Sequence, residues 1–316
     1  MMTQMVMRRI GIGVATLIVV SLIVFVGTSI LPGDVAQIVL GQSATPETLA
    51  AMRAKLGLDQ PWYIQYFTWL GNMATGDLGI SKAGGATISS LIGGRLGNTM
   101  LLAGIVAVIA VPLSVALGLY AAMHPGTWLD RIVTFGTLAT ISVPEFFIAT
   151  ILVLVFAVEL NWLPSTAYLS ADTTGFKLLI ALAMPIITLV IVVAAQMIRM
   201  TRAGILNVMS SPYIEMAILK GVPRRRIILR HAFFNAIGPI VNVIALNLAY
   251  LVSGVVIVET IFAYPGLAKL MIDGVQTRDL PLVQACAMIF CAVYVTLILL
   301  ADVASILSNP RLRHPK

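Results

Sequence analysis

Residues 178–198, LLIALAMPIITLVIVVAAQMI, decide what kind of fold this chain can adopt. The stretch contains no charged side chain, and the basic residues Lys177 and Arg199 bracket it. An α-helix needs about 20 largely apolar residues to cross the roughly 30 Å hydrocarbon core of a bilayer. The stretch therefore predicts a membrane-spanning helix.

The whole chain shares this apolar character. Its 316 residues are 59% hydrophobic and only 10% charged, whereas soluble domains average about 25% charged residues. So few charges could not cover a water-facing surface, which excludes a soluble enzyme, a disordered tail and a collagen-like fibre. Two cysteines exclude a disulfide framework. The net charge of +7 suits the cytoplasmic side of a membrane protein, and we expect no nucleic-acid partner.

Further apolar stretches of spanning length lie on both sides of residues 178–198. Alternation with the period of a β-strand is absent, so we predict an all-α polytopic membrane protein with six transmembrane helices. The first stretch follows Arg8 and Arg9 and has no cleavage site behind it, so we interpret it as a retained helix. The six stretches are 10–31, 98–121, 132–158, 178–198, 236–258 and 282–307.

The distribution of Lys and Arg predicts the orientation. With the N-terminus inside, the two short outer loops hold only Lys177, Lys269 and Arg278, and most other basic residues are cytoplasmic. Both termini are therefore expected in the cytoplasm. We divide the chain into an N-terminus with the first helix (1–31), an external helical segment (32–97) and a five-helix core (98–316).

The external segment carries its own helix signals. Thr45-Pro46-Glu47 is a helix start, and Gly57 is expected to end that helix. The aromatic residues between 62 and 69 belong to the types that gather at a membrane–water interface. We interpret the segment as a helical cap on the outer surface, which is compatible with docking of an external partner.

The cytoplasmic residues 199–240 have a helix–bend–helix pattern. Ser211-Pro212 starts a helix, Glu215 lies in its first turn, and Gly221 is a candidate C′ residue with positive φ. Pro223 then restarts a helix that contains Arg224, Arg225, Arg226 and Arg230. Two interpretations are equally compatible with these residues: a basic segment on anionic lipid, at about 1 kcal/mol per cation, and a mechanical contact with a cytoplasmic partner.

A resemblance favours the second interpretation. Residues 213–221, YIEMAILKG, resemble the EAA signature of ABC importer membrane subunits, although Met216 stands where its first alanine would be. Residues 230–239, RHAFFNAIGP, are similar to its continuation in the dipeptide/oligopeptide/nickel branch. The early LPGD resembles the first, B-type, of the two paired permeases. Further similar stretches are LPGD (31–34), LGLDQP (56–61), GDLG (76–79), VETIFAYPGL (258–267) and NPR (309–311).

The resemblance implies the ABC type I importer permease fold, with a coupling segment at 205–235. Glu215, Ala217 and Gly221 would lie in a coupling helix seated in a groove of an ATPase, with Arg224 and Arg225 following on the same face. The implied partners are a second and different permease, two cytoplasmic ATP-binding subunits that hold ATP and Mg, and an extracytoplasmic substrate-binding protein.

The implied function is ATP-driven import of peptides or a similar small solute across the bacterial cytoplasmic (inner) membrane. The alternative is an ATP-independent secondary transporter or channel, which should show internal repeats and buried charge relays. The chain has no phosphate-binding P-loop, no zinc-binding His-Glu-x-x-His and no Gly-x-Ser-x-Gly elbow. We therefore expect no catalytic residue, cofactor or metal on this chain, and no enzyme activity of its own.

Three acids in or near the predicted spans need an explanation, because charge in hydrocarbon is costly. Glu145 follows Pro144, which should bend the third span. Two hypotheses stay open for Glu145: a carboxylate on a watery pathway that meets the cationic end of a peptide, and an acid packed between helices. We expect Asp302 to pair with a cytoplasmic-side arginine, and Glu259 to have a structural or gating role.

Overall fold

The structure is a computed structural model that describes residues 2–30, 40, 44–55, 59–168 and 174–308. Within these ranges the protein is helical, and the only β pairing is an isolated bridge between Ile80 and Thr87. Five of the described helices are long and apolar enough to cross a membrane, or six if one bent pair counts as a span. The predicted all-α polytopic membrane protein is therefore confirmed.

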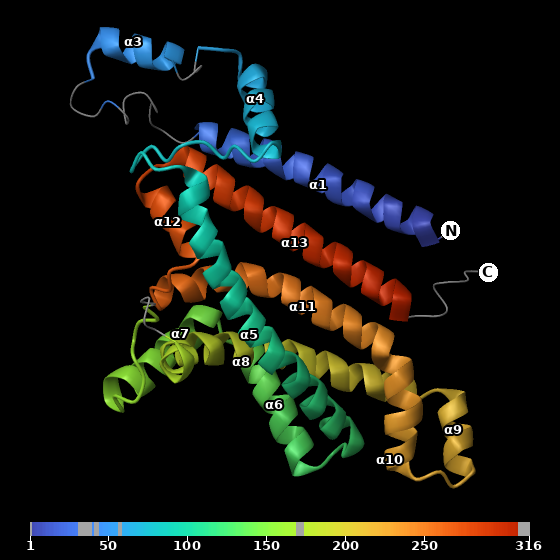
Figure 1. Cartoon of the computed structure of the whole chain (residues 1–316). Helices are drawn as coiled ribbons and strands as arrows, with labels where there is room; N and C mark the ends of the chain where they lie inside the picture. Colours follow the sequence, from blue (N-terminus) through green and yellow to red (C-terminus); the bar gives the residue numbers. More distant parts are fainter. Residues whose placement is uncertain (1, 31–39, 41–43, 56–58, 169–173, 309–316) are drawn as a thin grey trace. The chain divides into compact units, whose positions relative to one another are not determined.

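Figure 1 shows the order of the helices along the chain. They are α1 (Met2–Ile30), α3 (Pro46–Lys55), α4 (Trp62–Ala74), α5 (Ile88–Met123), α6 (Trp128–Ser142), α7 (Glu145–Leu152), the π-helix η2 (Val153–Glu159), α8 (Gly175–Met209), α9 (Pro212–Leu219), α10 (Arg224–Arg226), the π-helix η3 (Ile227–Ala232), α11 (Phe233–Ile261), α12 (Leu267–Gln276) and α13 (Leu280–Ser308). Most of the long helices extend beyond the apolar stretches predicted from the sequence. Hydropathy marks the membrane-embedded part of a helix and not its polar ends.

The chain forms two compact units. The first comprises Met1–Ile10, Thr99–Pro265 and Val293–Lys316, and the second comprises Gly11–Asn98 and Gly266–Ala292. In the first unit α8 is the central helix: 56% of its apolar window is buried within the protein, against 22% for the span that begins at Arg224. Its buried side chains pack with those of α11 and α5, and the cluster includes Leu102, Val106, Leu182, Leu189, Val193, Met197, Leu251, Val255 and Phe262.

The third predicted span contains a sharp break. Helix α6 ends at Ser142, Val143 is extended, and α7 begins at Glu145 at an angle of 105° to α6. Pro144 explains the break, because its ring excludes the helical conformation at Val143 and it offers no N–H for a helical hydrogen bond. The predicted bend is confirmed, but it is a change of direction between two helices and not a curve within one.

The basic segment after Pro223 differs from its prediction. We expect the helix that restarts at Pro223 and the span at 236–258 to be separate elements. Instead α10, η3 and α11 form one uninterrupted helix from Arg224 to Ile261. The polar-to-apolar change near residue 233 does not interrupt it, because neither a glycine in a left-handed conformation nor an extended residue occurs there.

In the second unit, α4 packs against α1 through its aromatic side chains. The Tyr66 hydroxyl lies 2.8 Å from Ser21 Oγ, and the Phe25 and Tyr66 rings meet edge to face at 5.4 Å. Trp62 and Phe67 on the same helix are exposed. The predicted helix at Pro46 is confirmed as α3, whereas its predicted end at Gly57 lies outside the described residues.

A buried acid organises the other end of this unit. Asp279 accepts hydrogen bonds from Ser81 Oγ at 2.5 Å and from the Leu282 backbone N–H at 3.4 Å, so it caps α13 and holds the turn near the β-bridge. Lys82 lies in the same turn, and burial lowers the pKa of its ammonium group although the charge of Asp279 opposes that shift.

Candidate functional site

Helix α9 has the local structure that its residues predict. Ser211 is extended at the N-cap and Pro212 occupies the first helical position, with Glu215 in the first turn. At the other end Gly221 has φ +73°, the Gly221 N–H donates to the Ile218 carbonyl, and the Val222 N–H donates to the Ala217 carbonyl. These two bonds form a Schellman motif, which requires a left-handed residue at C′. The predicted helix start and the predicted positive φ at Gly221 are confirmed.

One side chain anchors α9 and several point away from the protein. Ile214 is fully buried, and Ala217 is half-buried. Glu215 is exposed, as are the apolar side chains of Tyr213, Met216, Ile218 and Leu219, the last of which is 75% exposed. Figure 1 shows α9 beside α10, which follows the turn at Gly221. An exposed apolar surface on a firmly anchored helix is typical of a docking element.

The arginines that follow belong to the same end of the first unit. Arg224, Arg225 and Arg226 are all exposed, and none of the ion pairs in the described part of the chain involves them. Glu215 and Ala217 on α9 and Arg224 and Arg225 on α10 lie on either side of the turn at Gly221.

Helix α9 contacts η3 and α8, and η3 packs in turn against the long helices. Ile228 and Ala232 of η3 pack with Ala122 of α5 and Ile205 of α8 in one cluster. Helices α5 and α8 also approach closely: a Cβ on Gly118 would lie 2.8 Å from Thr201 Cβ and 2.9 Å from the Ile198 carbonyl oxygen. A displacement of α9 would therefore be transmitted to α5, α8 and α11, since interiors this tightly packed transmit strain.

An ion pair that the sequence did not reveal lies nearby. Arg202 Nε donates to Asp130 Oδ1 at 2.6 Å and its Nη2 donates to Oδ2 at 3.0 Å. Asp130 also accepts the Gly126 backbone N–H at 2.9 Å, and its side chain is only 5% exposed. The pair joins the start of α6 to α8. No sequence motif indicates it, because its partners are 72 residues apart.

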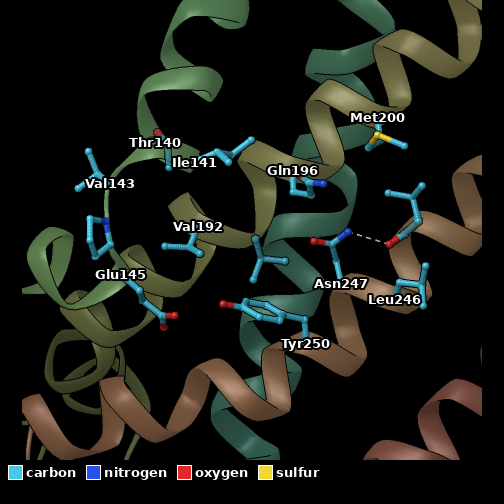
Figure 2. A pocket seen from close by; sticks show the side chains of 13 residues that line it. Thr140, Ile141, Val143, Glu145, Val192, Gln196, Met200, Leu246, Asn247 and Tyr250 are labelled. Carbon is cyan, nitrogen blue, oxygen red and sulfur yellow. Dashed lines mark hydrogen bonds between the residues drawn. The ribbon is translucent and has the colours of Figure 1, made fainter.

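A second candidate site lies at the break between α6 and α7. A pocket of about 550 Å³ opens between α6, α7, α8 and α11, and Glu145 lines it (Figure 2). Its other lining residues are Thr140, Ile141, Val143, Pro144, Val192, Val193, Gln196, Met200, Val243, Leu246, Asn247 and Tyr250. No residue of α9 lines this pocket, so the two candidate sites are separate.

Comparison with known proteins identifies the kind of protein. A family model described as "Binding-protein-dependent transport system inner membrane component" matches residues 114–314. A second model, for the N-terminal part of the membrane component of such systems, matches residues 2–107. The chain belongs to this family of inner membrane components.

Curated relatives of this inner membrane component match over nearly its whole length. The glutathione transport system permease protein GsiC of Escherichia coli K12 is 34% identical over 314 residues, which cover 99% of this chain and 100% of the relative. A Brucella melitensis protein named as a candidate peptide transport system permease is 34% identical with the same coverage. The protein is thus a multi-pass permease subunit of an ABC importer, a system that includes ATPase and substrate-binding components.

Asp302 and Glu259, the two other acids singled out in the sequence, have structural partners. Arg9 Nη1 lies 2.9 Å from Asp302 Oδ2, so the predicted pairing of Asp302 with an arginine is confirmed. Glu259 is fully buried and accepts a hydrogen bond from Thr99 Oγ1 at 2.6 Å. Among the described residues, no group of three or more His, Cys, Asp or Glu side chains is arranged to hold a metal. The LPGD stretch at 31–34 and NPR at 309–311 lie outside the described residues.

Proposed function

We propose that this permease imports peptides or a similar small solute across the bacterial cytoplasmic membrane, driven by ATP hydrolysis on partner subunits. The relatives named for peptide and glutathione transport support this solute class. The observation that carries the mechanism is α9, an anchored helix whose outer surface is apolar and exposed. Its position in the chain coincides with the EAA-like residues.

In this mechanism α9 is the coupling helix. Ile218 and Leu219 insert in a groove of an ATP-binding subunit, Glu215 makes a polar contact at the rim, and Ala217 keeps the helix close to η3. Gly221 supplies the turn, and Arg224 and Arg225 contact the same subunit or the adjoining lipid surface. ATP-driven closure of the two ATPases then moves α9, and the buried contacts of Ile214 transmit this movement to the spans.

We also infer which subunits assemble with this chain and which parts of it face the cytoplasm. This chain is the B-type member of a pair with a different permease chain, and an extracytoplasmic binding protein delivers the solute. Both termini and the coupling segment 205–235 are cytoplasmic, residues 32–97 form the external segment between the first helix (1–31) and the core (98–316), and Glu145 lies on the translocation pathway. ATP and Mg bind on the partner ATPases, and this chain has neither an ATPase site nor a cofactor of its own.

The test combines purification with one substitution. Purification from native membranes in mild detergent should recover a P-loop ATPase, a second permease and a binding protein. The Gly221→Val variant should lose the ATPase and ATP-dependent uptake, because a β-branched residue cannot adopt φ +73° without strain.

The matched control is Gly104→Val, since Gly104 is exposed on α5 and has no atom within 4 Å of its would-be Cβ. Transport by the isolated chain without ATP would contradict the proposal and favour a secondary transporter.

A further inference from the structure

The pocket beside Glu145 has polar groups on an otherwise apolar wall. Thr140 comes from α6, Glu145 from α7, Gln196 from α8, and Asn247 and Tyr250 from α11. Val192, Val193, Val243 and Leu246 form much of the rest. None of the lining residues is a lysine, arginine or histidine. The carboxylate of Glu145 is therefore the one ionisable acid in a pocket whose walls supply no positive charge.

Several oxygen atoms that line this pocket are available only as hydrogen-bond acceptors. Glu145 Oε1 is buried and accepts no hydrogen bond in the structure. The Asn247 amide nitrogen donates to the Val243 carbonyl at 2.8 Å, which leaves its side-chain oxygen as the group that faces the pocket. Thr140 Oγ1 already donates to the Gly136 carbonyl at 2.9 Å, so it too can only accept. In Figure 2 the Glu145 carboxylate and the Tyr250 hydroxyl point toward one another.

The Glu145 carboxylate occupies space that a side chain at residue 254 would otherwise fill. A Cβ on Gly254 of α11 would lie 3.3 Å from both Glu145 oxygens. Glycine at this position therefore leaves room for the carboxylate against α11, while Pro144 fixes the start of α7. Glu145 is therefore positioned by α7, of which it is the first residue, and by α11, against which its carboxylate packs.

A partner for this arrangement must donate hydrogen bonds and carry positive charge. An unpaired carboxylate in an apolar site is costly, and an anionic or purely accepting group would add repulsion. A primary ammonium group has three donors and no acceptor, which suits the unpaired Glu145 oxygen in a pocket that also contains Asn247 and Thr140. We propose that this pocket receives the primary ammonium group of the translocated solute, with the Glu145 carboxylate as its counter-charge. This inference rests on the proposed import function and specifies the class of solute.

The experiment uses the assembled importer in vesicles with ATP. The probes are trialanine, which has a free amino group, and N-acetyl-trialanine, which lacks it. The variants are Glu145→Gln, which keeps the shape but removes the charge, and Glu145→Asp, which keeps the charge on a shorter side chain. The control is Glu159→Gln, because Glu159 is an exposed acid at the end of η2 and lines no part of the pocket.

We expect Glu145→Gln to lower the initial rate of trialanine uptake at least tenfold, and Glu145→Asp to lower it less. Glu159→Gln should leave it unchanged. A merely structural role for Glu145 predicts the reverse order, since the isosteric Gln would pack well and the shorter Asp would not. Trialanine uptake by Glu145→Gln at the wild-type rate would overturn the inference.

A second measurement does not depend on transport. Dicyclohexylcarbodiimide modifies carboxyl groups in apolar surroundings, and mass spectrometry of the permease locates the label. Trialanine should slow labelling of Glu145 and N-acetyl-trialanine should not; equal labelling with both probes would also overturn the inference. The proposed function would fail differently, through ATPase recovery and uptake that are unaffected by Gly221→Val.

Discussion

The α9 turn and the Glu145 pocket belong to the same compact unit, but they satisfy their polar groups in opposite ways. At α9 the terminal carbonyls of Ala217 and Ile218 are paired by the Schellman bonds, and apart from Glu215 the exposed side chains are apolar. At the pocket the exposed surface is mixed, and a buried carboxylate oxygen has no donor. The difference agrees with the two partners that we propose: an apolar groove that covers α9, and a polar, cationic group that enters the pocket.

The largest expected effect is at the anchor of α9. Ile214→Asp would place a charge at a position that is 0% exposed, which costs several kcal/mol and should displace α9 from its packed position. We expect co-purified ATPase and ATP-dependent uptake to fall more than tenfold, while the protein still elutes as a single species in size-exclusion chromatography. Ile214→Val, which removes one methylene, is the control and should retain most activity. Full uptake by Ile214→Asp would show that α9 is not the connection.

The ion pairs offer a second comparison, between a buried and an exposed pair. Asp130→Asn leaves Arg202 without its counter-charge and should destabilise the purified permease by about 3 kcal/mol, the lower end for breaking a buried pair. Asp302→Asn, in a pair whose arginine side chain is 54% exposed, should cost about 0–1 kcal/mol. Thermal unfolding in detergent measures both, and equal shifts would refute a special role for the α6–α8 pair.

A smaller effect is expected at the wall of the pocket. Gly254→Ala adds a Cβ at 3.3 Å from both Glu145 oxygens and should push the carboxylate aside without changing its charge. Uptake of trialanine should fall a few-fold, by less than in Glu145→Gln. Gly104→Ala serves as the control, because its Cβ would meet nothing within 4 Å. Wild-type uptake by Gly254→Ala would mean that the position of the carboxylate is not critical.

The smallest effect lies in the second unit, outside both regions. Burial lowers the pKa of Lys82 below its usual value of 10.5, so the folded protein holds this proton less tightly than the unfolded chain. Stability should therefore rise with pH through a window just below 10.5. The Lys82→Gln variant should lose this rise in thermal unfolding at alkaline pH, and a variant of the exposed Lys220 should keep it. An unchanged slope in Lys82→Gln would contradict the assignment.

The two regions also differ in how far the sequence predicts them. The limits of α9 are local: Ser211-Pro212 starts it and Gly221 ends it, and each acts through bonds to residues within five positions. The same holds for the apolar spans and for the bend at Pro144. Local signals are sufficient here because helix caps and proline effects do not depend on distant residues.

What could not be predicted depends on contacts between distant residues. Glu145 looks like any acid after a proline, and only the position of Gly254 on α11 and the donors used by Asn247 reveal an unpaired oxygen. Asp130 and Arg202 form their pair only when α6 lies along α8. The continuity of the helix from Arg224 to Ile261 is hidden for another reason, because a change from basic to apolar residues resembles a boundary between elements.

That uninterrupted helix has a further consequence through η3. A π-helical turn contains one extra residue within an otherwise α-helical segment. If the turn were absorbed or shifted, every residue beyond it would advance by about 1.5 Å and rotate by about 100°. Asn247 and Tyr250 lie on the far side of that turn from Arg224. Such a change in η3 would therefore alter which side Asn247 and Tyr250 turn toward the pocket.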